Sequence, residues 1–180
     1  MQPRKQHLIE TALTLFNQHG YHATGIDLIL AESGVSKATL YKHFRSKEAL
    51  ILAVLQLRHE EVLMKLKENI ELAIQNEDSP ILAVFDSLDG WFNSETFFGC
   101  NFINVTAEYS DPMNPIKVFS AQHKQTIVDL INTYFHEDQK DRANQIDLLI
   151  EGAIVMAHTR GMKNAAKMAK EMAKKLILTI

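Results

Sequence analysis

The sequence predicts an all-α protein, and three observations support this fold class. Apolar residues recur at three- and four-residue spacings along most of the chain. Only seven glycines and four prolines occur in 180 residues, so few positions interrupt a helix. No alternation of apolar and polar residues lasts long enough to predict a sheet. Because 46% of the residues are hydrophobic and 23% are charged, the chain can form a core and lacks the composition of a disordered protein.

The charge of the chain is unevenly distributed around its net value of −3. Residues 1–48 hold six Lys/Arg against four Asp/Glu, whereas residues 49–180 hold thirteen against eighteen. A basic head on an acidic body is typical of a site-specific DNA-binding protein whose body faces away from the duplex. We therefore expect a DNA-binding domain at 1–48 and a second helical domain at 49–180.

The first helix is expected over residues 4–19. Leu8, Ala12 and Leu15 recur there at helical spacing and give the helix one apolar face, and Gly20 ends the pattern. This face predicts core packing in a small helical head.

Residues 24–48 predict a helix-turn-helix motif. Gly34 separates two short helices at 26–33 and 37–44, because glycine adopts the left-handed conformation of a helix end at little cost. Ser36 suits the N-cap of the second helix, since its hydroxyl can accept a hydrogen bond from a free backbone N–H. In such a motif the second helix enters the major groove of DNA.

The polar side chains of this second helix are left to face outward. Leu40 and Phe44 lie four residues apart and can face the core. Lysine, tyrosine and histidine can reach phosphates, and the short Thr39 can also approach base edges. Ser46 can cap the next helix, whose first turn beside Lys47 can hold a phosphate. The expected DNA-binding residues are Thr24, Ser36, Lys37, Thr39, Tyr41, Lys42, His43 and Lys47.

This region resembles the DNA-binding domain of the TetR family of transcriptional repressors. The resemblance rests on ALTLFNQHGYHATG at 12–25, AESGVSKATLYKHF at 31–44 and SKEAL at 46–50, and it covers about the first 55 residues. Gly25 departs from the family pattern, where threonine is frequent, and so does Ala38, where glycine is frequent. The resemblance implies a homodimer with a C-terminal domain for effector binding and dimerisation. It also implies a repressor that a small molecule releases from a palindromic operator.

Six further helices are expected after the head, which gives about nine in total. The longest runs over 46–75 and is long enough to reach both domains. A polar connection is expected around Asp138–Arg142. The segment 97–116 is similar to a Gly-Cys and Ala-Glu segment in the C-terminal domain of some TetR-like regulators. The remaining expected helices lie at about 80–93, 101–109, 115–135, 142–159 and from 162 to the end.

The last two helices carry apolar stripes that favour a dimer interface, with small residues that permit close helix approach. The alternative is that these stripes complete the core of one subunit. The expected interface residues are Ile146, Ile150, Ala153, Ile154, Ala157, Ala165, Ala169, Met172, Ala173 and Leu176.

Aromatic residues gather in the middle of the body and favour a ligand pocket, because pockets are typically apolar with a few polar groups. The alternative is an ordinary helical core. The expected effector-pocket residues are Met64, Trp91, Phe92, Phe97, Phe98, Cys100, Phe102, Phe119 and His123.

The sequence does not favour an enzyme, a cofactor or a metal site. His59-Glu60-Glu61 lacks the second histidine of a zinc helix motif, and the histidines and single cysteine do not suggest a catalytic triad. Because one cysteine cannot form an intramolecular disulfide, and no signal peptide or membrane span is apparent, we expect a cytoplasmic protein. Two alternative functions remain: an architectural DNA-binding protein without an effector, and a ligand-binding helical protein with a vestigial DNA head.

Overall fold

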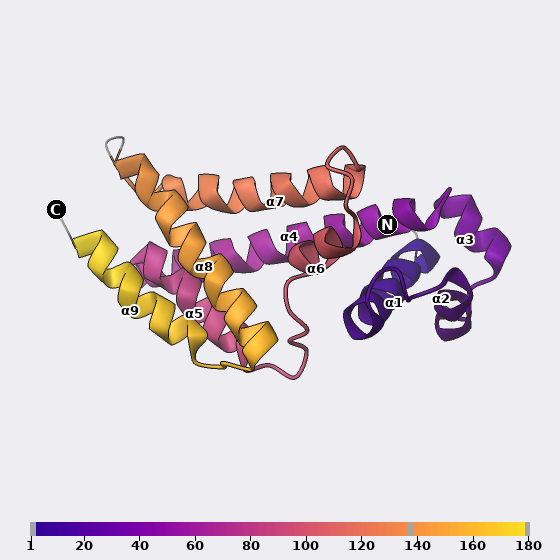
Figure 1. The fold of residues 1–180 in the computed structure, drawn as a ribbon, viewed down its shortest axis with the longest axis horizontal. Coiled ribbons are helices and arrows are strands. Elements are labelled where there is room, and N and C mark those ends of the chain that lie inside the picture. The colour runs from indigo at the N-terminus through magenta and orange to yellow at the C-terminus, as the bar shows by residue number, and fades with distance from the viewer. Residues whose placement is uncertain (1–2, 137–138, 179–180) are drawn as a thin grey trace. The chain divides into compact units, whose positions relative to one another are not determined.

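The structure is a computed structural model that describes residues 3–136 and 139–178. Within these ranges the chain forms helices and no strand, which confirms the all-α prediction (Figure 1). The helices, in chain order, are α1 (Pro3–His19), α2 (Ile26–Ser33), α3 (Lys37–His43), α4 (Lys47–Gln75), α5 (Pro80–Phe92), α6 (Asn101–Glu108), α7 (Pro115–Asn132), α8 (Lys140–Arg160) and α9 (Ala165–Leu178).

Three helix ends differ from the prediction by more than one residue, and one of them is the start of α9, which lies at Ala165 and not at residue 162. The helix expected to reach residue 135 ends at Asn132, because the next three N–H groups donate to carbonyls three residues earlier and tighten the chain into turns. The helix expected from residue 142 begins at Lys140. Residue 138 of the expected polar connection, and the last two residues of the expected final helix, lie outside the described residues.

The chain divides into two compact units. The first comprises the residues up to 61 together with 100–123, and the second comprises 62–99 together with the residues from 124 onward. Helices α4 and α7 therefore each contribute residues to both units. The boundary predicted between residues 48 and 49 falls inside α4 and remains a prediction about how the two functions are divided.

The core of the first unit includes the apolar face of α1, which packs against α2 and α3. Leu8, Leu15 and Phe16 are buried, which confirms the core packing predicted for this helix. Ile29 of α2 and Leu40 of α3 are fully buried as well. These contacts hold α3 by one side and leave its other side exposed.

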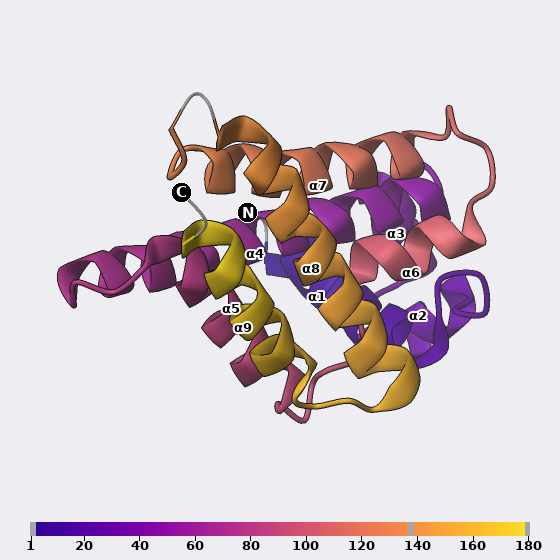
Figure 2. The ribbon, with the colours of Figure 1, turned by 60° about the vertical axis from the view of Figure 1, so that its left-hand side comes forward.

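The second unit contains α5, α8 and α9, which pack against one another (Figures 1 and 2). Lys170 of α9 places its Nζ 2.5 Å from Oδ1 of Asp86 on α5. Arg142 of α8 donates from Nη1 to the carbonyl oxygen of Leu176 at 2.9 Å. Polar contacts therefore fix α9 to both of its neighbours.

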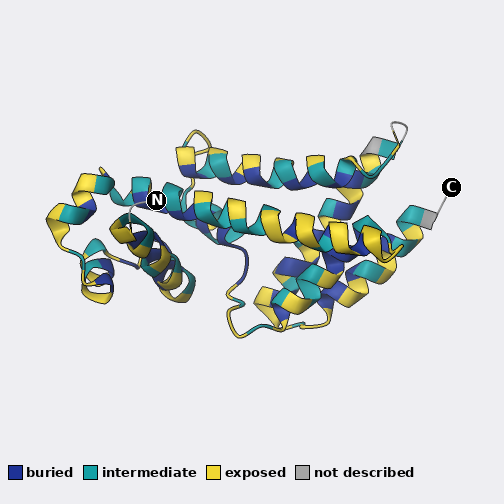
Figure 3. Cartoon of the chain, turned by 180° about the vertical axis from the view of Figure 1, so that it is seen from behind, coloured by how far each residue is buried: buried dark blue, intermediate teal, exposed yellow. Residues whose placement is uncertain are grey.

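The helices are amphipathic and are not apolar on all sides. Buried residues run along one side of the long helices and exposed residues along another (Figure 3). In the part of the chain that the structure describes, no helix combines the length and the hydropathy needed to cross a membrane.

Candidate nucleic-acid interface

Helices α2 and α3 form the predicted helix-turn-helix. Gly34 follows α2 in the left-handed conformation, with φ of 64°, and its N–H donates to the carbonyl oxygen of Leu30 at 3.0 Å. This ends α2 as the sequence predicts. Ser36 caps α3, because its Oγ accepts a hydrogen bond from the backbone N–H of Thr39 at 3.2 Å. The two helices are thus joined by a short turn with fixed ends.

The side chains of α3 separate into a buried and an outer side. Leu40 is fully buried, and Phe44, the C-cap that follows the helix, is 4% exposed. On the outer side, Lys37 and Lys42 are exposed and Tyr41 is 46% exposed. A tyrosine with half of its surface in water and two lysines beside it can donate hydrogen bonds to phosphate oxygens. The outer side of α3 therefore has the chemistry of a DNA-binding surface.

Three other predicted residues complete this surface. Ser36 is exposed, and Thr39 and His43 are partly exposed. The Oγ1 atom of Thr39 lies 2.9 Å from Oγ of Ser36, so the two hydroxyls already form a hydrogen bond. The ammonium of Lys37 lies 4.0 Å from Oδ1 of Asp27, but both side chains are mostly exposed, and such pairs contribute little. Lys37 can therefore exchange Asp27 for a DNA partner.

Lys47 is the first residue of α4 and differs from the lysines of α3. Its Nζ donates to the carbonyl oxygen of His22 at 3.1 Å, in the loop between α1 and α2. Partial burial lowers the pKa of its ammonium, while Glu48 and Glu108 act in the opposite direction. Lys47 thus lies beside the free N–H groups of the α4 start, in a position set by the α1–α2 loop.

Thr24 does not belong to the exposed set. Its side chain is fully buried, and its hydroxyl donates to the carbonyl oxygen of Gly20 at 2.7 Å. A second contact joins the same hydroxyl to the carbonyl oxygen of Leu15 at 3.3 Å. The expectation that this side chain touches DNA is corrected, because its hydroxyl holds the end of α1.

The residues expected to form an effector pocket are distributed over both compact units. Cys100, Phe102, Phe119 and His123 belong to the first unit. In that unit the ring of His123 stacks on Phe102 with 3.6 Å between ring centroids, and its Nδ1 lies 2.9 Å from Nδ1 of His59. One imidazole must donate and the other must accept. His59 was missed as a member of this cluster, because 64 residues separate the two histidines.

The other expected pocket residues, Met64, Trp91, Phe92, Phe97 and Phe98, belong to the second unit. Trp91 meets Phe97 edge to face with 4.9 Å between ring centroids, and Phe92 is fully buried. Lys163 places its Nζ 4.9 Å from the centroid of the Phe97 ring. Met64 is 59% exposed and Phe98 37%. The aromatic residues of this unit therefore pack on one another and on Lys163.

Most of the expected dimer-interface residues are buried in the single chain. This holds for Ile146, Ile150, Ala153, Ile154, Ala157, Ala165, Ala169 and Ala173, whereas Met172 is 55% exposed and Leu176 is partly exposed. Besides Met172, the exposed apolar residues of α8 and α9 include Leu148, Val155 and Met168. In the single chain these small residues pack inside their own unit, which is the alternative given for the stripes, and their place in a dimer interface remains a prediction.

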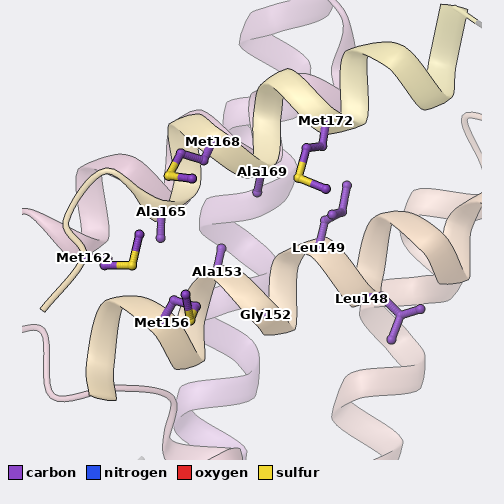
Figure 4. Close-up of a pocket in the computed structure, with 10 residues that line it drawn as sticks. All are labelled: Leu148, Leu149, Gly152, Ala153, Met156, Met162, Ala165, Met168, Ala169 and Met172. Atoms are coloured by element: carbon purple, nitrogen blue, oxygen red, sulfur yellow. The ribbon is translucent and has the colours of Figure 1, made fainter. Parts of the chain in front are cut away.

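A shallow depression of about 160 Å³ lies between α8 and α9. Met156 and Leu149 of α8 face Met168 and Met172 of α9 across it, and Gly152 and three alanines form its floor, while Leu148 points away (Figure 4). Its lining is almost wholly apolar, and the methionines can adjust to the shape of a partner. We call the face formed by Leu149 and Met156 of α8 and Met168 and Met172 of α9 the methionine face; Val155 is not part of it.

No group of three or more metal-ligating side chains lies together among the residues that the structure describes.

Comparison with known proteins finds a family match for the region of the helix-turn-helix. Residues 8–54 match the model of bacterial regulatory proteins of the tetR family. The transcriptional activator FasR of Mycolicibacterium smegmatis is 35% identical over 89 residues, which are 48% of this chain and 41% of FasR. The chain thus spans less than half the length of this curated relative.

Two further comparisons cover most of the chain. The uncharacterised transcriptional regulator YxaF of Bacillus subtilis is 26% identical over 162 residues, which are 86% of this chain and 85% of YxaF. The crystal structure of SCO4454, a TetR-family transcriptional regulator from Streptomyces coelicolor, superimposes with a TM-score of 0.85 at 27% identity. That superposition covers 98% of this chain and 90% of SCO4454, so the fold is shared beyond the DNA-binding region.

Proposed function

We propose that the chain belongs to the TetR family of bacterial regulatory proteins, as the match of residues 8–54 indicates, and that it is a homodimeric, sequence-specific DNA-binding regulator that represses transcription. The observation that carries the proposal is the outer side of α3. Leu40 anchors this helix in the core, while Tyr41 and Lys42 remain exposed at its surface. A helix held in this way can enter a major groove without rearranging the head.

The polar residues of the head divide by the contact we assign to each. Tyr41, Lys42 and Lys47 bind phosphates and fix the register of the head on DNA. Lys37 and Thr39, at the start of α3, approach base edges, since the N-terminal residues of a recognition helix lie deepest in the groove. Ser36 and His43 flank these residues at the two ends of the helix.

Two copies of the chain associate through the methionine face of α8 and α9. A two-fold dimer presents two reading helices to half-sites about 34–36 Å apart, so the operator is palindromic. Exposed apolar side chains such as Met168, at 52%, and Met172, at 55%, support this assignment, because a second copy would remove them from water.

A small molecule releases the dimer from its operator. Each unit by itself offers apolar surface with polar groups beside it, as ligand sites require: Phe102 lies with the His59–His123 pair in the first unit, and Trp91 and Phe97 lie with Lys163 in the second. The ligand binds more tightly to a conformation in which the two α3 helices are not spaced to fit the half-sites. Operator binding is then weakened by the difference in the ligand's binding free energy between the two conformations, typically about 1–3 kcal/mol. Because FasR is described as an activator, a reporter gene must decide the direction of control for this chain.

The first test is binding to the DNA upstream of the protein's own gene against a scrambled duplex, over a series of salt concentrations. We expect tight binding to the native fragment, and Tyr41→Ala and Lys42→Ala should weaken it. Lys42→Ala removes one charged phosphate contact from each of the two heads, so it should lower the slope of log affinity against log salt by about two, or about one per head. Lys65→Ala, at an exposed position of α4 in the other unit, is the matched control and should leave binding unchanged.

Each other outcome contradicts a different part of the proposal. Equal, weak binding to both duplexes would favour an architectural protein without sequence preference. Specific binding that survives both α3 substitutions would remove α3 from the interface. A compound that saturates the protein and leaves operator affinity unchanged would exclude release by that compound.

A further inference from the structure

The carboxylate of Glu108, the last residue of α6, binds the loop between α1 and α2. Its Oε1 accepts a hydrogen bond from the backbone N–H of Tyr21 at 2.8 Å, and its Oε2 accepts from that of His22 at 2.6 Å. All three residues belong to the first compact unit. We infer that Glu108 is a positioning residue for operator binding, although it lies far outside the DNA-binding region in sequence. The inference rests on the proposed function.

The loop is built to receive this carboxylate. Gly20 has φ of +84°, and a Cβ added there would lie 3.2 Å from Oε1 of Glu108. Glycine therefore allows both the left-handed backbone and the close approach of the carboxylate. The Nδ1 atom of His22 also lies 3.3 Å from Oε2 of Glu108. Hydrogen bonds to a charged acceptor are among the stronger ones in proteins, so two of them hold the loop firmly.

The loop passes this constraint to residues proposed to bind DNA. The carbonyl oxygen of His22 accepts a hydrogen bond from Nζ of Lys47 at 3.1 Å. Glu108 therefore binds the backbone N–H of His22, and the carbonyl group of the same His22 binds Lys47 at the start of α4. Thr24 lies two residues before the start of α2, and its hydroxyl donates to the carbonyl oxygen of Gly20 at 2.7 Å. A displaced loop would move both Lys47 and the start of the helix-turn-helix.

The opposite end of α6 is attached to the same region. Asn101 donates from Nδ2 to Oδ1 of Asn17 at 2.6 Å and to the hydroxyl of Tyr21 at 3.1 Å. Tyr21 in turn donates to the carbonyl oxygen of Asn101 at 3.4 Å. Burial raises the pKa of the Tyr21 hydroxyl, which therefore keeps the proton that it donates. Because both ends of α6 are fixed to residues 17–22, a shift of α6 must move this segment or break its hydrogen bonds.

The test is operator affinity of the full-length Glu108→Gln and Glu108→Ala variants. Removing a negative charge should by itself strengthen binding to DNA, which is a polyanion. Weaker binding by these variants therefore cannot come from the change in charge. We expect Glu108→Ala to weaken operator binding about tenfold, since hydrogen bonds to charged groups contribute more than neutral ones. Glu108→Gln should lose less, because its amide keeps one acceptor oxygen. Glu60→Gln, at an exposed position in the same unit, is the charge-matched control.

A second measurement separates positioning from stability. Affinity is compared well below the melting temperature of every variant, and amide hydrogen exchange is followed over residues 20–24. Positioning predicts faster exchange in this segment and weaker operator binding while the protein stays folded. Operator affinity equal to that of the wild type, or a loss that appears only where the variants begin to unfold, would overturn the inference. Failure of the wild type itself to select its operator would instead contradict the proposed function.

Discussion

Asp147 of α8 is a carboxyl group whose surroundings disfavour its charge. Its Oδ1 is buried and has no hydrogen-bond partner among the described residues. Burial and, to a smaller degree, Glu151 raise its pKa from 3.8 to about 6, and Lys124 acts in the opposite direction. Between these two pH values the folded protein holds a proton that the unfolded chain has released. The free energy of unfolding therefore falls as pH rises through this window, because the unfolded state binds fewer protons.

Removing this charge should stabilise the protein near neutral pH. We expect Asp147→Asn to raise the free energy of unfolding by about 1 kcal/mol at neutral pH, which is less than the full pKa shift implies because the carboxyl is partly solvated. The gain should shrink as pH approaches the unfolded-state pKa. Urea unfolding at several pH values measures it, with Asp129→Asn at an exposed position of α7 as the control. A gain that is independent of pH would contradict the assignment to this carboxyl.

At the scale of the element, α3 depends on its N-cap for its start. Ser36 is both that cap and a residue proposed to lie near DNA, so one substitution cannot separate its two roles. Ser36→Ala should lower the free energy of unfolding by about 1 kcal/mol through loss of the cap. Ser36→Asp should keep the stability, since aspartate caps equally well, but should weaken operator binding because its charge repels phosphate. Chemical unfolding and operator titration of both variants measure the two effects; equal operator affinity for Ser36→Asp and the wild type would remove residue 36 from the interface.

The helices could be predicted from the sequence because local residues determine where they begin and end. Gly34 and Ser36 mark the turn of the helix-turn-helix, and Ser79 with Pro80 marks the start of α5, as the structure confirms. The outer side of α3 followed from the same local pattern, since Leu40 identified the buried side. Thr24 was misassigned because its burial depends on carbonyl groups at the end of α1, which no local pattern reveals.

Contacts between distant residues could not be predicted in this way. The stripe containing Ile150 and Ala169 was recognised as apolar, but periodicity does not distinguish burial in the same chain from burial in a partner. The contact of Glu108 with Tyr21 joins residues 87 positions apart, and it involves a backbone N–H that has no sequence signature. A carboxylate at the end of a short helix is in itself an ordinary surface feature.

At the scale of the whole molecule, the methionine face can be tested without disturbing the fold of one chain. Met168 is 52% exposed, so Met168→Glu places its charge in solvent as long as the chain is a monomer. In a dimer built on this face the same charge would be buried without a partner, which costs several kcal/mol. We expect sedimentation equilibrium to show a dimer for the wild type and a monomer for the variant, with an unchanged helical circular dichroism spectrum. Leu72→Glu, at a residue of α4 that is 56% exposed, is the control and should remain a dimer.

The same variant connects the oligomeric state to DNA recognition. A dimer gains affinity from a second half-site because the second head binds at a high effective concentration. The wild type should therefore lose much of its affinity when one half of the palindrome is scrambled. The Met168→Glu monomer should bind the full operator and the half-site with similar, low affinity, since only one head engages either duplex. If the variant dissociates into monomers and still prefers the full palindrome, the two heads assemble on DNA through contacts other than the methionine face.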